Sequence, residues 1–386
     1  MHLVSVIAGV LVILSVLLDA FESVVLPRRV QRSFRLSNWY YRRSWRRWSF
    51  VARHIRSAAR REAFLGYFGP LSLLVLLGLW AAGLILGFAL LQYGAGEHVA
   101  FGNQPITFGL LLYHSGETFY TLGYGDVTPN SGLSRFLSVV EAGMGFAFLG
   151  VVIGYLPTIY SAFSDREIEI SLLDARAGSP PTAFELLARF GKTRSQLALD
   201  GILKDWERWS AQLLESHLSY PPLGFFRSQH NNQSWLGALT AMLDTTALII
   251  TGIDGVSSDQ AKLTFAMARH AIVDLGQVAD GRFDPLAPDR LPDEHLAHLR
   301  QSLRERGFEL RGGEDAESKL QSLRAMYEPY AEALAHNLLI TLPPWLHAEK
   351  RRDNWQAGPW DRAIQAKGLA GLSQAKPHRH PADDHF

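Results

Sequence analysis

Residues 116–129 read GETFYTLGYGDVTP, and this stretch lies between two long apolar runs. Gly123 and Gly125 flank a tyrosine, with Thr121 before them and Asp126 after them. Glycine adopts backbone angles that other residues avoid, so the successive carbonyls of such a loop can point to one side. A ring of these oxygens can replace the water shell of a dehydrated cation. Because one chain supplies one strand of such a ring, this chemistry requires several copies around an axis.

Three apolar segments predict helices that cross a membrane, which makes the expected fold an all-α membrane protein. Residues 3–18 carry no charge, and a helix continued to Leu26 is long enough for a hydrocarbon core of about 30 Å. A secretory signal peptide is the weaker interpretation of 1–26, because no Lys or Arg precedes the apolar run. The second span lies within residues 63–96, which hold no charge, and the third within 136–163, where Glu141 is the one charged residue.

Residues 105–120, PITFGLLLYHSGETFY, are apolar enough to enter the membrane but too short to cross it and return. We therefore expect a re-entrant helix there. Non-helical backbone is tolerated at membrane depth only where it is buried in protein or lines a water-filled path. The loop at 121–126 is accordingly predicted to line such a path.

The loop sequence TLGYGD resembles the selectivity filter of the potassium channel pore-loop family, in its bacterial form with one pore domain per chain. Leu122 stands where that family usually has valine or isoleucine. Glu117 and Thr118 match a Glu-Thr pair that supports the filter from the end of the pore helix. Gly145, twenty residues after Gly125, matches the hinge glycine of the inner helix. The likeness implies a pore domain over 63–163, with an additional transmembrane helix before it.

This resemblance implies a homotetrameric potassium channel of one chain with three further copies of itself, without catalysis and without a cofactor. Backbone carbonyls of the filter, together with the Thr121 hydroxyl, would coordinate the transported K⁺; the filter residues are Thr121, Leu122, Gly123, Tyr124 and Gly125. The Tyr124 ring would pack outward, while Glu117 and Asp126 would share a proton or a water behind the filter.

The inner helix is expected over 133–163. Gly145 and Pro157 are its expected gating hinge, since proline removes a helix hydrogen bond near the inner end. Glu141 lies within this span and must face protein or water. Its partner is either Arg135, about two turns away, or another carboxylate near the filter.

Residues 27–62 hold twelve arginines, no lysine and one glutamate, a net charge of +11 in a chain whose total is +1. Such a loop is expected on the cytoplasmic side, which places the N-terminus outside and the residues from 164 onward inside, in the inner membrane of a bacterium. Trp and Tyr alternate with arginine pairs; the arginines are Arg42, Arg43, Arg46 and Arg47. Either this segment is a helix that binds anionic lipids of the inner leaflet, or it is an ordinary positively charged loop.

The C-terminal half shows helical spacing and almost no strand alternation, which predicts a cytoplasmic helical domain over 164–371 and a disordered tail over 372–386. Helices are expected at 182–191, 195–218, 234–251, 257–278, 292–306 and 316–340. Thr182 with Glu185, and Ser257 with Gln260, have the spacing of capping boxes. Asp165, Glu167 and Glu169 follow the third span and would either concentrate cations at a pore exit or form a solvated helix face.

Several chemistries are excluded or disfavoured in this half. The chain has no cysteine, so thiolate metal sites are excluded. The pairs His295/His298 and Glu215/His217 lack further ligands, no nucleotide-binding glycine pattern follows a strand, and no nucleic-acid partner is expected. Residues 219–235 form either a ligand pocket or, more simply, a structured loop, and the domain's ligand or partner is not named by any motif.

The leading hypothesis is thus a potassium-selective channel that the C-terminal domain gates. The alternatives are a weakly selective cation channel and a membrane-anchored helical adaptor whose pore is vestigial. An enzyme is not expected.

Overall fold

The computed structural model describes the chain in ranges: 2–26, 35–96, 99–100, 105–190, 195–230, 232–278, 284, 287–347, 353–354 and 360. The predicted tail at 372–386 and part of the basic segment, 27–34, lie outside these residues. The described chain divides into two units. The first comprises residues 1–163 and 219–226, and the second comprises 164–218 and 227–386.

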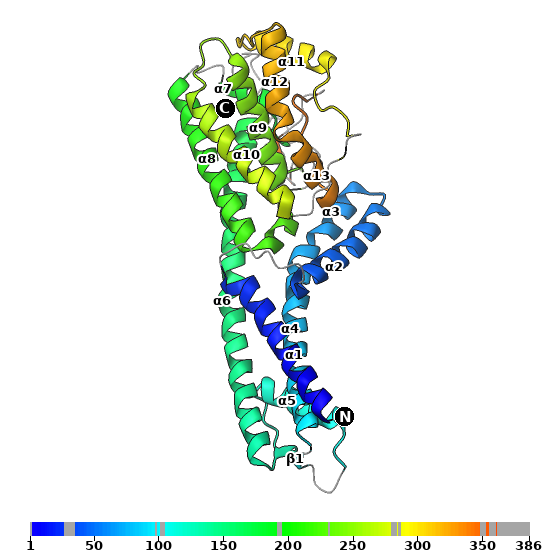
Figure 1. Ribbon diagram of the computed structural model, residues 1–386. Coiled ribbons are helices and arrows are strands. Elements are labelled where there is room, and N and C mark those ends of the chain that lie inside the picture. Colours follow the sequence, from blue (N-terminus) through cyan, green and yellow to red (C-terminus); the bar gives the residue numbers. More distant parts are fainter. Residues whose placement is uncertain are drawn as a thin grey trace. The chain divides into compact units, whose positions relative to one another are not determined.

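The first unit is a set of apolar helices, and Figure 1 shows α1 running alongside α4. Its elements are α1 (His2–Ala20), the π-helical turn η1 (Phe21–Val25), α2 (Leu36–Arg53), α3 (Ala58–Gly66), α4 (Phe68–Ala95), α5 (Phe108–Phe119), α6 (Gly132–Ala177) and the 3₁₀ turn η2 (Pro221–Phe225). The strands β1 (Val99–Ala100) and β2 (Thr128–Pro129) pair antiparallel, with Val99 opposite Pro129. Helix α6 begins in this unit and continues past the predicted end at 163.

Helices α1 and α4 approach closely because small residues face each other. A Cβ on Gly9 would lie 2.7 Å from the Gly87 carbonyl oxygen, and a Cβ on Gly87 would lie 2.5 Å from Ile13 Cγ1. Glycine at such crossings lets membrane helices pack backbone to backbone. The first predicted span therefore packs closely against α4 within the first unit.

Asp19 ties α1 to two other helices. Its carboxylate accepts hydrogen bonds from the Ser37 backbone N–H (3.1 Å), the Ser37 hydroxyl (3.0 Å) and Trp80 Nε1 (2.9 Å). Ser37 lies in the first turn of α2, where backbone N–H groups lack helical partners and favour a negative charge. The buried Asp19 thus caps α2 from a distance.

Four helices of the described chain are long and apolar enough to cross a membrane, one more than the sequence predicts. The segments are 3–24, 58–95, 132–177 and 235–252. The fourth is α9 (Trp235–Gly252), which was expected as a bundle helix, and 94% of it is buried. Its apolar side chains are already covered within the second unit.

The second unit packs helices around α9. The helices that contact it are α7 (Ala183–Phe190), α10 (Asp259–Val278), α12 (Glu314–Ala325) and α13 (Glu328–Leu338), and the unit also holds α8 (Gln196–Ser219) and α11 (Asp293–Glu305). The single helix predicted at 316–340 is wrong. Pro329 lies in the first turn of α13, and proline cannot donate to the carbonyl four residues earlier, so the helix breaks at Met326 and Tyr327.

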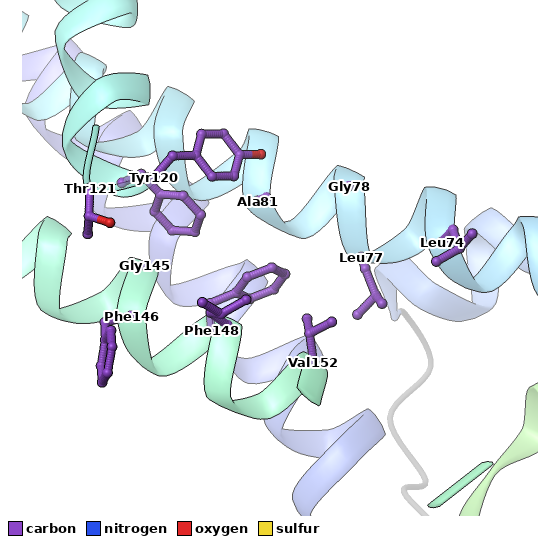
Figure 2. A pocket seen from close by; sticks show the side chains of 12 residues that line it. Leu74, Leu77, Gly78, Ala81, Tyr120, Thr121, Gly145, Phe146, Phe148 and Val152 are labelled. Carbon is purple, nitrogen blue, oxygen red and sulfur yellow. The ribbon is translucent and has the colours of Figure 1, made fainter. Parts of the chain in front are cut away.

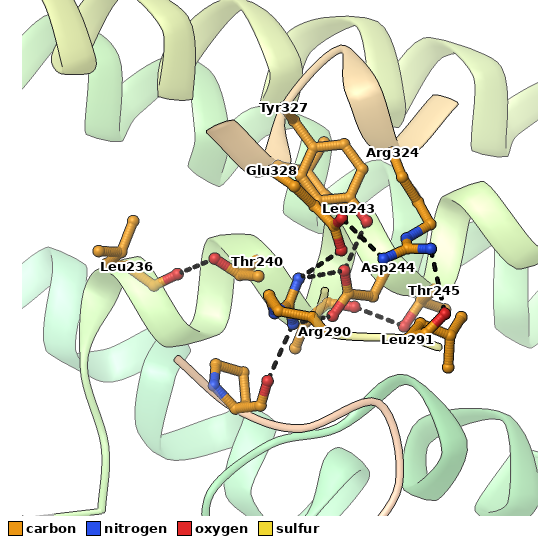
Figure 3. Close-up of polar contacts among 12 residues, drawn as sticks. Leu236, Thr240, Leu243, Asp244, Thr245, Arg290, Leu291, Arg324, Tyr327 and Glu328 are labelled. Atoms are coloured by element: carbon orange, nitrogen blue, oxygen red, sulfur yellow. Dashed lines mark hydrogen bonds and ion pairs between the residues drawn. The ribbon is translucent and has the colours of Figure 1, made fainter. Parts of the chain in front are cut away.

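A buried polar network fixes α9 to the loop before α11 and to α13 (Figure 3). The Arg290 guanidinium contacts both carboxylate oxygens of the fully buried Asp244, at 3.1 and 2.7 Å, and also Glu328 at 3.1 Å. Burial, with Asp244 as the next cause, raises the pKa of the Tyr327 hydroxyl well above its ordinary value. Tyr327 therefore stays protonated and donates to Asp244. This closed network is a structural tie between three parts of the unit.

Neither of the two predicted capping boxes forms in full. The Thr182 hydroxyl accepts from the Glu185 N–H at 3.1 Å, as expected, but the Thr182 N–H donates to the Ala177 carbonyl at 2.9 Å and not to the Glu185 side chain. The box at Ser257 is wrong, because its backbone N–H donates to Gln196 Oε1 at 3.0 Å while the Gln260 amide donates to Glu207 at 2.7 Å. Gln196, the first residue of α8, therefore accepts the hydrogen bond from the Ser257 N–H that the local spacing predicted for the Gln260 side chain.

Candidate functional site

Helix α5 is a short helix that ends at the glycine-rich loop. It starts three residues later than the predicted 105–120 helix because the Thr107 hydroxyl caps it, accepting from the Leu110 N–H at 3.2 Å. Twelve residues rise about 18 Å, too little for a hydrocarbon core of about 30 Å. A helix of this length can enter a membrane but cannot cross it, so the chain must return to the same side through the loop that follows.

The loop has a regular backbone alternation. Thr121, Gly123 and Gly125 have positive φ angles of 54°, 62° and 78°. When every second residue is left-handed, the intervening peptide units turn their carbonyls toward the same side. The turn is fixed at its start by hydrogen bonds from the Thr121 N–H to the Thr118 carbonyl (3.0 Å) and from the Leu122 N–H to the Glu117 carbonyl (2.8 Å). Residues 121–126 are exposed in the single chain.

His114, which the sequence analysis did not single out, connects α5 to α6. One ring nitrogen lies 3.1 Å from Glu117 Oε1 and the other lies 3.2 Å from the Ser138 hydroxyl. All of these side chains except that of Ser138 are buried. The spacing of three residues between His114 and Glu117 on a helix was the available signal, since such residues lie on one face.

Glu117 and Asp126 have separate partners, and the hydrogen bonds of the described residues include none between them. Glu117 pairs with His114, whereas Asp126 accepts from the Tyr113 hydroxyl at 3.1 Å and from the Val127 N–H at 3.0 Å. The Glu117 carboxylate is therefore held within α5, whereas the Asp126 carboxylate joins the end of the loop to Tyr113 of α5. Tyr124 is 68% exposed in the single chain.

Glu141 is fully buried in α6, and its partner is neither of the two predicted. Its carboxyl group is hydrogen-bonded to the Ser115 hydroxyl, whose oxygen also lies 2.7 Å from the Ile85 carbonyl oxygen. Because a hydroxyl has one proton, Ser115 donates to one of these two oxygens at a time. Arg135 instead donates to the Pro129 carbonyl at 3.3 Å. Ser115 thus joins α4, α5 and α6 directly behind the loop.

Gly145 lies where α6 passes under the end of α5, beside a cavity of about 280 Å³ (Figure 2). A Cβ at Gly145 would overlap the Phe119 carbonyl, so only glycine permits this approach. The cavity wall is apolar and includes the base of the loop; residues along it are Leu77, Ala81, Phe119, Thr121, Phe148 and Val152. The structure gives Gly145 a close-packing role at the position predicted as a hinge.

Pro157 lies inside α6, which continues without interruption to Ala177. Next to it, the Thr158 hydroxyl donates to the Gly154 carbonyl at 2.8 Å. Side-chain bonds of this kind tend to bend a helix, and this one lies in the turn where proline lacks a backbone N–H, so the local structure is compatible with the predicted hinge.

The four arginines Arg42, Arg43, Arg46 and Arg47 lie on one exposed side of α2, while Trp45 is buried on the other. The described part of the basic segment is therefore an amphipathic helix. Glu167, by contrast, is not the solvated or pore-exit acid that the sequence suggested: it is buried and pairs with Arg166 at 3.0 Å. Among the described residues, no group of three or more His, Asp or Glu side chains could hold a metal ion.

Comparisons with known proteins point to the same segment. Residues 74–161 match the profile of a family described as "Ion channel". The chain is 26% identical over 189 residues to the uncharacterized membrane protein YdjJ of Bacillus subtilis (strain 168), covering 48% of this chain and 54% of that protein. It is 34% identical over 84 residues to protein LctB of Geobacillus stearothermophilus, covering 19% of this chain and 62% of that protein. No solved structure matches the chain significantly.

The chain spans less than two thirds of the length of each of these two relatives. The family segment includes all of α5 and the loop, with most of α4 and part of α6. Together with the apolar helices, this match indicates a multi-pass membrane protein that contains a segment similar to the ion channel family.

Proposed function

We propose that this protein is a potassium-selective channel that works as a homotetramer. The observation that supports this most is the left-handed backbone at every second residue of the loop, Thr121, Gly123 and Gly125, which turns consecutive carbonyls to one side. Carbonyl rings of this kind replace the hydration shell of K⁺ during conduction. The Thr121 hydroxyl completes the inner end of the ion path.

The exposure of the loop supports the need for further copies. Residues 121–126 are exposed in the single chain, although they follow a helix too short to cross the membrane. Backbone at membrane depth must be covered by protein or line water. Four copies around an axis provide both, with the carbonyls toward the axis and the Tyr124 ring against a neighbouring copy.

The test is reconstitution of the full chain into vesicles, with the reversal potential measured under opposed K⁺ and Na⁺ gradients. We expect a potential near that of K⁺, and loss of the current in Gly123→Ala, because alanine is strained at a φ of 62°. Gly143→Ala is the matched control, since a Cβ at Gly143 meets nothing within 4 Å. A potential midway between the two ions would instead indicate the weakly selective channel, and the absence of any current would indicate the adaptor.

The arginine distribution supports an orientation in the bacterial inner membrane. Positively charged segments stay on the cytoplasmic side, so α2 and the second unit are cytoplasmic in this proposal and the N-terminus is outside. Cysteine labelling of this cysteine-free chain in intact cells, at Leu3 and at Leu197, tests it. Only Leu3→Cys should react with a membrane-impermeant reagent.

We further propose that α2 binds anionic phospholipid headgroups. Its exposed side combines the four arginines with Trp39 and Phe50, which are 50% and 65% exposed. Each arginine near an anionic surface contributes about 1 kcal/mol to binding. The amount of phosphatidylglycerol that co-purifies with the protein should therefore fall when all four arginines are replaced by glutamine, but not in the control Arg304→Gln, an exposed arginine of α11.

A further inference from the structure

Residues 219–226 come from the C-terminal half of the sequence but belong to the first unit. The chain leaves α8 at Ser219, forms the 3₁₀ turn η2 (Pro221–Phe225), and returns to the second unit at Arg227. The sequence analysis placed this segment inside the C-terminal domain, whereas its contacts group it with the first unit. The reason is a set of aromatic contacts with residues far away in the sequence.

Phe225 occupies an aromatic socket formed by α2 and the start of α4. Its ring centroid lies 5.0 Å from that of Trp45, 5.0 Å from that of Phe68 and 5.8 Å from that of Tyr41, with the Tyr41 ring nearly parallel to it. Aromatic pairs at these separations each contribute about 0.5–1.5 kcal/mol beyond the area that they bury. The segment is thus held firmly to the outer helices of the unit.

The same segment contacts the inner half of α6. Phe226 lies 5.6 Å from Phe163 and 6.0 Å from Tyr160, and Tyr220 lies 5.8 Å from Tyr155, measured between ring centroids. Residues 219–226 therefore form a bridge from α2 and α4 on one side to α6 on the other.

Glycine makes room for this bridge. A Cβ on Gly69 would lie 2.6 Å from Phe226 Cδ2, closer than any ordinary carbon contact. Leu223 at the centre of the segment is completely buried. Alanine at Gly69 would therefore displace Phe226 without changing the segment itself.

Both ends of the segment are tied to the continuation of α6. Before it, His217 Nε2 lies 3.3 Å from Arg166 Nη1; after it, the Ser228 hydroxyl donates to Glu167 at 3.1 Å. The segment thus contacts α6 between Tyr155 and Phe163. The residues that flank the segment contact the same helix about one turn further along, at Arg166 and Glu167. Because Phe225 packs against Phe68 of α4 and Phe226 against Tyr160 and Phe163 of α6, a displacement of this stretch of α6 relative to α4 must deform these aromatic contacts.

We propose that residues 219–226 are a coupling segment that sets the position of the inner half of α6 and thereby controls ion flux. This inference rests on the proposed function, because it needs a conducting pore. The most apolar stretch of α6 is only 11% buried in the single chain, and the aromatic contacts of the coupling segment are one of the restraints on its inner half. Rearrangement of the second unit can reach the pore through this restraint, since α8 leads directly into it.

The first experiment measures K⁺ flux per reconstituted channel in the full chain. Phe225→Ala empties the aromatic socket and Gly69→Ala displaces Phe226, so we expect both to change the flux at least about threefold in the same direction. Gly78→Ala is the matched control on α4, where a Cβ meets nothing within 4 Å. The double variant should change the flux no more than the larger single one, because both changes release one contact.

The second experiment locks the segment. The chain has no cysteine, so Tyr155→Cys combined with Tyr220→Cys introduces a single pair across the contact. Oxidation should change the flux and reduction should restore it. The coupling role is refuted if the crosslink forms and the flux stays equal to that of the wild type. It is also refuted if Gly69→Ala and Phe225→Ala fold and lose thermal stability but keep the wild-type flux. A wild-type protein that does not conduct overturns the proposed function and this inference together.

Discussion

Helices α6 and α9 are both apolar and long enough to cross a membrane, yet they have opposite surroundings. Of the residues in α9, 94% are buried, whereas 11% are buried in the most apolar stretch of α6. Helices α7, α10, α12 and α13 cover α9. The apolar side chains of α6 need a solvent that the single chain does not supply, and a bilayer or further copies can provide it. Composition identifies a helix that avoids water, but only packing shows what replaces the water.

The buried polar residues of α9 and α6 also differ in their hydrogen-bond partners. The hydroxyls of Thr240, Thr245 and Thr251 in α9 donate to carbonyls four residues earlier in their own helix. Asp244 is paired with Arg290 from another element. In α6 the buried carboxyl group of Glu141 is paired with Ser115 of α5. Buried polar groups thus hold α9 within a folded core, and they join α6 to α5.

The largest effect is expected in the core around α9. Asp244→Ala leaves the Arg290 guanidinium buried without its carboxylate, which costs about 3–5 kcal/mol of unfolding free energy. Denaturant unfolding of the full chain in detergent, followed by tryptophan fluorescence, measures it. The control Asp205→Ala removes an exposed carboxylate of α8 and should change stability by less than about 0.5 kcal/mol. Equal midpoints for Asp244→Ala and the wild type would show that this network does not hold α9 in place.

The next largest effect tests what surrounds α6. Ile153 on α6 and Leu197 on α8 are both strongly exposed in the single chain, at 64% and 85%. Arginine near the centre of a membrane span costs about 2.5–3.5 kcal/mol, while a surface substitution in water costs less than about 0.5 kcal/mol. We therefore expect Ile153→Arg to reduce the fraction of protein retained in membranes after an alkaline wash, and Leu197→Arg to leave it unchanged. Similar retention of both variants would place α6 outside the bilayer.

The span positions and the glycine-rich loop were predictable from the sequence because their signals are local. Uninterrupted apolar runs mark α1, α4 and α6, and Gly123 and Gly125 mark the left-handed positions of the loop. The break before α13 was also present as a local signal, since Pro329 cannot lie in the middle of the predicted helix.

The remaining features depend on contacts between distant residues. The rings of Phe225 and Trp45 are in contact, although α4 and α6 lie between the two residues in the sequence. No periodicity of the sequence relates these two positions. The pairing of Glu141 with Ser115 likewise depends on how α5 packs against α6. Residue type predicted that Glu141 needs a partner, but the partner's identity follows only from the packing.

A smaller effect is expected where α6 passes under α5. Gly145→Ala places a methyl group against the Phe119 carbonyl and forces the two helices apart, at a cost of about 1–3 kcal/mol. Gly150→Ala is the control on the same helix, since a Cβ there meets nothing within 4 Å. Thermal unfolding in detergent and K⁺ flux should both decline for Gly145→Ala only. If the two variants behave alike, the contact with Phe119 does not position the loop.

The effect spread over the widest range of conditions is a pH dependence in the second unit, which is small within any fraction of a pH unit. Burial, followed by the nearby Arg166 charge, lowers the pKa of His217 from 6.5 to about 3. Between these two values the unfolded chain binds a proton that the folded chain does not, so stability falls as the pH drops through this window, by up to about 1.4 kcal/mol per pH unit. Above pH 6.5 the histidine is neutral in both states and contributes no slope.

In His217→Gln the amide oxygen can still accept from Arg166 but does not titrate. The stability of this variant should therefore fall less steeply between pH 6.5 and 4.5 than that of the wild type. The control His270→Gln, an exposed histidine of α10, should keep the wild-type slope, and an unchanged slope in His217→Gln would mean that His217 is protonated in the folded chain.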